Sequence, residues 1–190
     1  MIYHVCTWLF WEILEHGKTT VAKIVGHILS ELHILGANSP FIEASRETLI
    51  GQYVGHTEKK VIEAVHNALG GVLFIDEAYA LTTDDSSADF GARALDVLVN
   101  QMEIHKNDLC VIFAGYHDIT LDFLRTNPGL NSRVPFQIEF GDYTEEELYQ
   151  IFRIFIKKSN YKLQSGIKRI LIEHFKKIKR QKSFGKRKIC

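Results

Sequence analysis

Gly71-Val72-Leu73-Phe74-Ile75-Asp76-Glu77-Ala78 is a short apolar run that ends in two adjacent carboxylates. Such a run is typical of a strand that is buried on both faces, because a strand of this kind shows no alternation with polar residues. The sequence therefore predicts a strand that delivers two acids to one edge of a sheet. Successive side chains of an extended chain point in opposite directions, so Asp76 and Glu77 are suited to different tasks.

In nucleotide hydrolases a pair of acids at such an edge divides the work. One acid helps to hold a Mg²⁺ that bridges the phosphates, and another residue orients or polarises the attacking water. On this pattern Asp76 is a predicted magnesium and nucleotide residue, and Glu77 is a predicted catalytic residue. The alternative is a strand that ends at a solvated acidic turn, and this stretch alone is compatible with both.

Upstream, Gly17-Lys18-Thr19-Thr20 directly precedes a segment with apolar residues at helical spacing. Backbone N–H groups and the helix dipole favour phosphate at a helix N-terminus. In a phosphate-binding loop the lysine reaches the phosphate oxygens and the following hydroxyl ligates Mg²⁺, which makes Thr19 the second predicted magnesium residue. The residues predicted to contact the nucleotide here are Gly17, Lys18, Thr19 and Thr20.

The phosphate-loop signature is incomplete in this chain. The full pattern needs a glycine five residues before Gly17, and Glu12 stands at that position. Residues 12–16 read Glu-Ile-Leu-Glu-His, and bulky acidic residues cannot wrap around a phosphate as glycines do. We therefore expect residues 1–16 to form an aberrant N-terminal segment outside the nucleotide-binding core.

Three further segments share a recognisable pattern: LIGQYVGHT at 49–57, VIFAGY at 111–116 and NPGLNSR at 127–133. Together with GGVLFIDEAYAL at 70–81, they make the chain resemble the AAA+ ATPases. Within these proteins the chain is most similar to the CbxX/CfqX group, which includes red-type Rubisco activase and stage V sporulation protein K, and the sporulation branch looks closest. The resemblance covers about residues 17–160.

The resemblance implies that the protein binds ATP and Mg²⁺ and couples ATP hydrolysis to the remodelling of a protein partner. It implies a homo-oligomeric ring, a hexamer in the family, that grips a polypeptide substrate in its central pore. It also implies a cytoplasmic location. The rival function is a degenerate, catalytically weak or inactive nucleotide-binding or interaction module that kept the fold after losing the phosphate loop.

The resemblance also assigns residues to roles beyond the acidic strand. Tyr53-Val54-Gly55 corresponds to the pore loop, with a loop that packs on the core as the alternative. Arg133 corresponds to the catalytic arginine finger that reaches into a neighbouring subunit, with a solvated turn residue as the alternative. Tyr116 stands at a sensor position beside the nucleotide, with a buried structural tyrosine as the alternative.

Composition is that of an ordinary globular domain: 190 residues, of which 46% are hydrophobic and 24% charged. The formal net charge is zero, which gives no global indication of a nucleic-acid or membrane partner. The three cysteines are scattered, which argues against a disulfide framework or a zinc site and fits a reducing compartment.

Strand and helix signals alternate along the chain, which predicts an α/β fold with a parallel sheet sandwiched by helices. The resemblance implies that this fold is of the P-loop NTPase type. We expect the AAA+ nucleotide-binding core at residues 17–141. A capping box, Thr144-x-x-Glu147, then opens an all-helical segment at 142–190. This segment is expected to be a truncated lid, because the family's Phe-Gly-Asn-Ala-Arg sensor motif is replaced by Phe184-Gly185 and the basic residues 186–188.

Both departures from the family pattern have one explanation in the genetic code. Residues 4–16 can be back-translated so that a shifted frame reads an apolar strand followed by Gly-Asn-Pro-Gly-Thr. With one A removed from the Lys186 codon, the chain from Gly185 can read Gly-Asn-Ala-Arg-Tyr-Val. We therefore expect the chain to be a frameshifted or mis-sequenced copy of a longer protein.

Overall fold

The computed structural model of the chain describes residues 6–12, 17–53, 55–82, 88–141, 143–164 and 166–186. These residues divide into two compact units, Met1–Gly141 and Asp142–Cys190. None of the helices in these ranges is long and apolar enough to cross a membrane.

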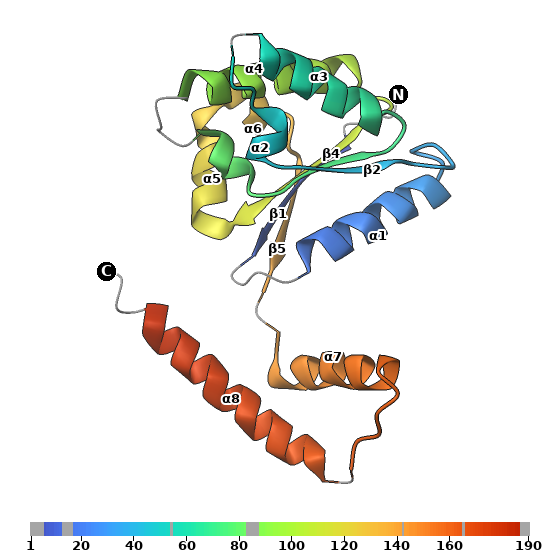
Figure 1. The fold of residues 1–190 in the computed structure, drawn as a ribbon, viewed down its shortest axis with the longest axis vertical. Coiled ribbons are helices and arrows are strands. Elements are labelled where there is room, and N and C mark those ends of the chain that lie inside the picture. Colours follow the sequence, from blue (N-terminus) through green and yellow to red (C-terminus); the bar gives the residue numbers. More distant parts are fainter. Residues whose placement is uncertain are drawn as a thin grey trace. The chain divides into compact units, whose positions relative to one another are not determined.

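The first unit contains a five-stranded sheet with the order β2-β3-β4-β1-β5, in which every neighbouring pair is parallel (Figure 1). The strands are β1 (Cys6–Glu12), β2 (Phe41–Ala44), β3 (Val72–Ile75), β4 (Cys110–Tyr116) and β5 (Phe136–Phe140). The helices are α1 (Lys18–Glu31), α2 (Arg46–Leu49), α3 (His56–Ala68), the 3₁₀ helix η1 (Ala78–Thr82), α4 (Ala88–Ile104), α5 (His117–Thr126) and α6 (Pro128–Asn131). The predicted α/β fold of the P-loop NTPase type is confirmed.

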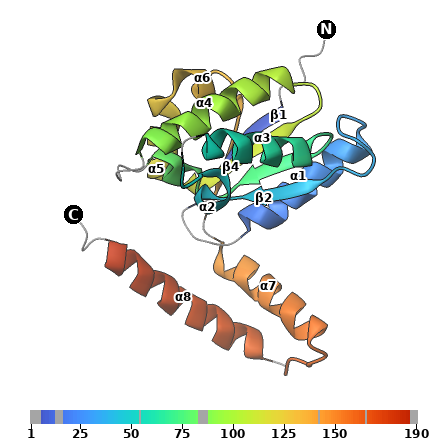
Figure 2. The ribbon, with the colours of Figure 1, turned by 45° about the horizontal axis from the view of Figure 1, so that its top comes forward.

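The central strands are buried on both faces, and each face has its own apolar core. Along β3, Leu73 and Ile75 belong to a core shared with α3, α4 and α5, whereas Val72 and Phe74 belong to a core shared with α1. Figure 2 shows α1 on one side of the sheet and α3 and α4 on the other. The period of two along a strand thus distributes one continuous apolar run over two cores.

The segment Cys6–Glu12 differs from the sequence expectation, because it forms β1 in the interior of the sheet rather than lying outside the core. It pairs with β4 on one side and β5 on the other. Leu9 and Phe10 are fully buried in the two opposite cores, and Trp8 stacks on Phe136 with 4.6 Å between ring centroids. An apolar run that fills both cores favours a buried strand, whatever the residues that follow it.

Strand β4 continues to Tyr116, where it still pairs with β1. Helix α5, which follows β4 directly, was not expected from the sequence.

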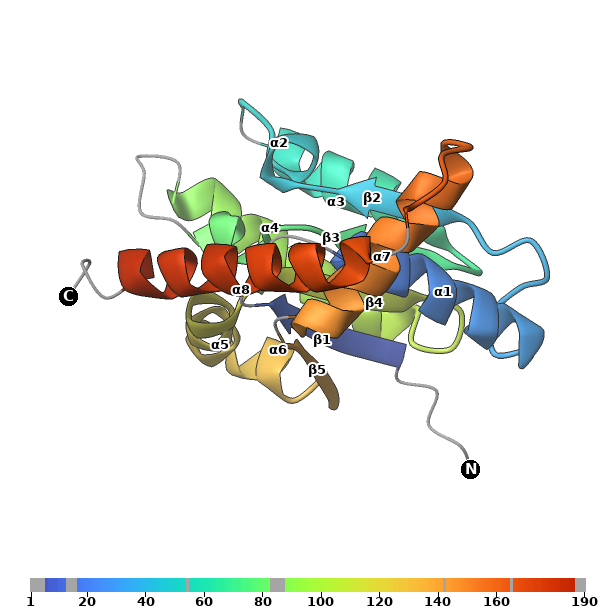
Figure 3. The same cartoon turned by 90° about the horizontal axis from the view of Figure 1, so that it is seen from below.

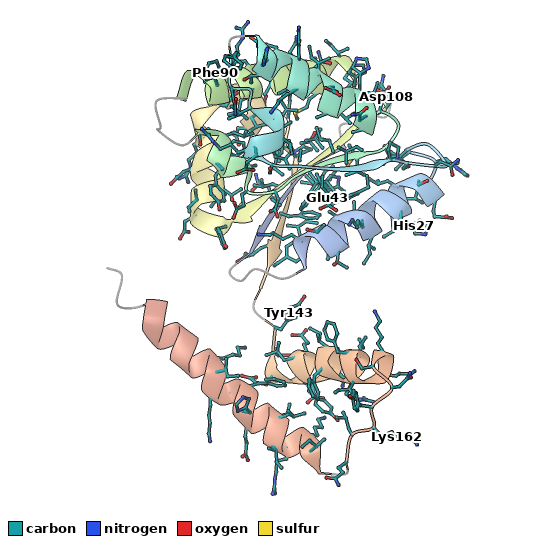
Figure 4. All side chains as sticks on the ribbon, in the orientation of Figure 1. His27, Glu43, Phe90, Asp108, Tyr143 and Lys162 are labelled. Atoms are coloured by element: carbon teal, nitrogen blue, oxygen red, sulfur yellow. The ribbon has the colours of Figure 1, made fainter. Side chains whose placement is uncertain are left out.

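The second unit is a pair of helices, α7 (Glu145–Lys158) and α8 (Ile167–Lys186), joined by a short connection (Figures 1 and 3). The expected capping box is present: Thr144 N donates to Glu147 Oε2 at 2.6 Å, and Glu147 N donates to Thr144 Oγ1 at 3.2 Å. An ion pair of 2.6 Å between Lys168 Nζ and Glu146 Oε1 joins the two helices. Figure 4 labels Tyr143 and Lys162, which flank α7. Residues 187 and 188 of the altered sensor motif lie outside the described residues.

Close packing at the start of β3 leads to a first prediction. A Cβ added to Gly71 would lie 2.1 Å from the carbonyl oxygen of Pro40, which also accepts a hydrogen bond from Val72 N at 2.8 Å. Because this oxygen is a main-chain atom held by a hydrogen bond from β3, Gly71→Ala has to push β2 and β3 apart. We expect the free energy of unfolding to fall by about 1–3 kcal/mol in chemical denaturation.

The control is Asn67→Ala, at an exposed position on α3. Its effect should stay within about 0.5 kcal/mol, as is usual for surface substitutions. Equal stability of the two variants would contradict the packing assigned to Gly71.

Candidate functional site

A cavity of about 240 Å³ lies where the N-terminus of α1 meets the carboxyl ends of β3 and β4. The carboxyl ends of parallel strands are where open α/β sheets bind ligands. Six residues with predicted site roles line this cavity: Gly17, Lys18, Thr19, Asp76, Glu77 and Tyr116.

The N-terminus of α1 is open to an anion. Gly17 is the N-cap residue, with φ of 124°, a backbone conformation that L side chains rarely adopt. It has no side chain to cap the helix, and the first turn carries no acidic residue. The first N–H groups of the helix and the positive end of its dipole are therefore available to a negatively charged ligand.

Lys18 supplies a fixed positive charge at the same point. The residue is only 9% exposed, and its Nζ lies 5.1 Å from the centroid of the Tyr116 ring. An aromatic face stabilises a partly desolvated cation. Tyr116 thus lies in the cavity wall beside the lysine, at the end of β4, where the sequence placed a sensor residue.

The two acids are held by a sharp turn after β3. Asp76 N donates to Ala44 O at 3.0 Å, so the main chain still follows β2 at this residue. Glu77 N then donates to Asp76 Oδ1 at 3.0 Å, and Glu77 has φ of 48°, in the left-handed region. Residues with such backbone angles often occur at functional sites. The turn brings both carboxylates to one cavity instead of continuing the strand.

Tyr79 is a site residue that the sequence did not indicate. Burial raises the pKa of its hydroxyl to about 12, and the charge of Glu77 and a hydrogen bond to that carboxylate add to the rise. Its ring centroid lies 6.1 Å from that of Tyr116. A Cβ on Gly115 would lie 2.9 Å from the Tyr79 ring, so this glycine makes room for the tyrosine. The sequence feature that could have pointed to Tyr79 is its place as an aromatic residue three positions after Asp76.

None of the other predicted site residues that the structure describes lines this cavity. Thr20 is exposed on α1. Tyr53 is 66% exposed, and its ring meets that of His56 edge-on at 5.3 Å. Gly55, with φ of 81°, is the N-cap residue of α3, and Val54 lies outside the described residues. The tyrosine is thus available to a partner.

Arg133 also lies outside the cavity lining, in contact with residues of the first unit. Its Nε donates to Glu103 Oε2 at 3.3 Å, and its Nη1 donates to Gly129 O at 2.9 Å. Both partners belong to the first unit. Within one copy of the chain, Arg133 is therefore not part of the cavity that Lys18 and Asp76 line.

The oxygen donors of the cavity are of the type that Mg²⁺ prefers. Asp76 offers a carboxylate and Thr19 a hydroxyl. In the described ranges there is no group of three or more His, Cys, Asp or Glu residues that could hold a metal. A magnesium ion at this cavity therefore requires further ligands from phosphate or water, which is its usual arrangement with nucleotides.

Comparison with solved structures gives a fold of the same kind. The crystal structure of the FIGL-1 AAA domain in complex with ADP superposes with a TM-score of 0.59 at 20% identity, and covers 87% of this chain and 53% of that one. At this identity the likeness concerns the fold.

Relatives identified by sequence share a higher identity with the chain than this structure does. A CfxQ homolog of Galdieria sulphuraria is 42% identical over 89% of this chain and 55% of the relative. The chloroplastic ribulose bisphosphate carboxylase/oxygenase activase of Cyanidioschyzon merolae is 40% identical over 89% and 57%, and the protein CbbX of Cereibacter sphaeroides is 42% identical over 77% and 47%. The chain thus spans about half the length of these relatives.

Residues 9–142 match the model of the ATPase family associated with various cellular activities (AAA). This match covers more than half of the chain, and the CfxQ, CbbX and Rubisco activase relatives agree with the group predicted from the sequence motifs. The chain belongs to the AAA family of ATPases.

Proposed function

We propose that this chain binds ATP in the cavity between α1, β3 and β4, hydrolyses it, and couples hydrolysis to the remodelling of a protein partner. The observation that carries the proposal is the convergence of Lys18, Asp76 and Glu77 on one cavity. These residues come from two elements that are far apart in the sequence, and each has the chemistry that phosphoryl transfer needs.

Each residue has a role in this proposal. Lys18 and the N–H groups of α1 bind the phosphates, and Thr19 and Asp76 hold Mg²⁺, which neutralises charge on the phosphate oxygens when bound. Glu77 polarises the attacking water. Tyr79 lies close enough to Glu77 for the charge of that carboxylate to raise its pKa, and in this proposal its hydroxyl orients the carboxylate. Tyr116 faces the nucleotide in the sensor position.

The partner and the assembly follow from the family and from exposure. Relatives named Rubisco activase act, by their name, on another protein. The exposed Tyr53, with Val54 and Gly55, is proposed as the pore loop of a homo-oligomeric ring, a hexamer, that works in the cytoplasm. Arg133 is the proposed finger to the next subunit. A sporulation protein K-like member remains a prediction, since the relatives above carry other names.

The second candidate is a nucleotide-binding or interaction module without turnover. Glu12 stands where the phosphate loop has a glycine, and bulky residues follow it. This sequence favours weak phosphate binding. ATP turnover of the wild-type protein is the quantity that separates the two candidates.

Nucleotide binding should depend on Lys18. Lys18→Ala removes the cation in the cavity wall, and a lost charge-assisted contact of about 1.5–3 kcal/mol weakens ATP affinity about tenfold to a hundredfold. Calorimetric titration with ATP and Mg²⁺ measures this change.

Lys23→Ala is the matched control, because Lys23 lies on the same helix but pairs with Glu43 at 2.7 Å, outside the cavity. Equal affinity of the two variants would remove Lys18 from the site. A wild-type protein that binds no ATP would overturn both candidate functions that involve a nucleotide.

Turnover should depend on Glu77 and, across a subunit boundary, on Arg133. Loss of general-base help costs about 10²- to 10⁴-fold, and loss of an arginine finger about 10³- to 10⁵-fold. We expect Glu77→Gln and Arg133→Ala each to bind ATP normally and to be nearly inactive in a steady-state phosphate-release assay.

Mixing the two variants should restore part of the turnover, because some interfaces then combine an intact Glu77 with a neighbour's intact Arg133. The control is each variant mixed with itself. No recovery in assemblies shown to exchange subunits would rule out a finger that acts in trans, and wild-type turnover of Glu77→Gln would rule out its role.

The contact between Tyr79 and Glu77 can be measured without turnover. The pKa of Tyr79 is raised to about 12, so its contribution to stability is complete below its ordinary value of 10.0 and is lost as the pH rises through 12. Glu77→Gln removes a negative charge that raises this pKa, so Tyr79 should titrate at lower pH. Tyrosinate absorbance measures the change, and Tyr79→Phe identifies the signal. An unchanged titration in Glu77→Gln would contradict the contact.

A further inference from the structure

The guanidinium group of Arg133 is held on two sides by its own subunit. Its Nε and Nη2 lie 3.3 and 3.2 Å from Glu103 Oε2, which is a side-on approach to one carboxylate oxygen. Its Nη1 donates to Gly129 O at 2.9 Å. Two points of attachment on different nitrogens fix both the position and the plane of the group.

Both attachment points are anchored in the core of the first unit. Glu103 follows Met102, which is buried in the core through which α4 packs on the sheet. Gly129 belongs to α6, where Asn127 Oδ1 accepts a hydrogen bond from Leu130 N at 3.0 Å, and Leu130 is fully buried. Both contacts of Arg133 are therefore made to helices that pack in the core of the first unit.

The remaining oxygen of Glu103 binds a second cation. Lys106 Nζ lies 3.0 Å from Glu103 Oε1. The hydrogen bond and charge of Lys106 hold the pKa of Glu103 below its usual value, and Arg133 acts in the same direction. Glu103 is thus a carboxylate at neutral pH, with one oxygen for each cation.

Stability alone is a poor reason for this arrangement. The Glu103 side chain is 51% exposed, and ion pairs with exposed partners contribute little to folding. Its consequence is that the guanidinium group of Arg133 is held in one orientation. A guanidinium group has five N–H donors. Nε–H and one N–H of Nη1 make the hydrogen bonds above, and Nη2 lies at ion-pair distance from Glu103. In the described part of the chain, further N–H donors remain on the two terminal nitrogens, and these can bind phosphate oxygens.

We infer that Glu103 is the positioning residue of the arginine finger: it holds Arg133 so that the N–H groups left on its terminal nitrogens meet the phosphoryl oxygens of a nucleotide bound by the neighbouring subunit. This inference rests on the proposed function, in which Arg133 acts across a subunit boundary. Glu103 itself does not touch the nucleotide.

The first test reads the contact directly and needs no turnover. Arg133 Nε–H exchange with solvent is measured by ¹⁵N NMR in the wild-type protein, in Glu103→Ala and in Lys106→Met. We expect slow exchange in the wild type and in Lys106→Met, and at least tenfold faster exchange in Glu103→Ala, since only that variant removes the acceptor of Nε–H. Equal exchange in all three proteins overturns the inference.

The second test measures the effect of Glu103 on ATP turnover. A misplaced catalytic group can cost about 10²-fold in rate, so Glu103→Ala should lower kcat about tenfold to a hundredfold with KM for ATP unchanged. Glu103→Gln keeps an acceptor oxygen and should recover part of kcat. Lys106→Met breaks the other ion pair of Glu103 and should leave kcat at the wild-type value. In an Arg133→Ala background, Glu103→Ala should have no further effect on kcat.

The outcomes separate the inference from the function on which it rests. A wild-type protein without turnover, or an Arg133→Ala variant with wild-type kcat, overturns the proposed function and the positioning role with it. An inactive Arg133→Ala beside a fully active Glu103→Ala overturns the positioning role alone. So does an equal loss of kcat in Lys106→Met, or a further loss in the double variant, because each indicates a general structural effect.

Discussion

The site depends on a step in the parallel sheet. Strand β3 pairs with β4 only as far as Ile75 opposite Phe113, whereas β4 continues to Tyr116 beside β1. Because β3 ends first, the chain can turn at Asp76 and Glu77 without leaving the sheet edge, and β4 supplies the adjoining wall. The N-terminus of α1 faces the same edge. A register that aligned both strand ends would fill this space with main chain, so the pairing of two apolar strands determines where the polar residues can meet.

Two aromatic rings lie between Lys18 and Glu77, the positive and negative groups of the site. Lys18 lies over Tyr116, Tyr116 lies beside Tyr79, and the charge of Glu77 helps to raise the pKa of Tyr79. In the proposed function, the rings beside Lys18 lower the local dielectric and so strengthen its field on a phosphate. Gly115 allows this layer to approach β4, since a side chain there would collide with Tyr79.

Features that a local pattern encodes were predictable from the sequence. The apolar run of β3 and the Gly-Lys-Thr before α1 predicted the acids, the helix N-terminus and their common sheet edge. Strand β1 was missed because the altered residues after it outweighed its own apolar run, although burial in two cores depends only on that run. Glu103 was beyond prediction, because it stands 30 residues from Arg133 and meets it only through the packing of α4 and α6.

The incomplete phosphate loop and the two acids bear on different quantities. The loop bears on nucleotide affinity, and the acids bear on the rate of the chemical step. A glycine-rich loop contributes N–H groups to phosphates that are already present in the ground state, so its loss weakens binding of substrate and transition state alike. In the proposed function, Glu77 and a neighbour's Arg133 act mainly on charge that develops during transfer. Changes at residues 12–16 therefore bear on affinity, whereas the geometry of Asp76, Glu77 and Arg133 bears on the chemical step. In the proposed function, weak phosphate binding can be offset by a higher nucleotide concentration, whereas a misplaced catalytic group lowers the rate at every nucleotide concentration.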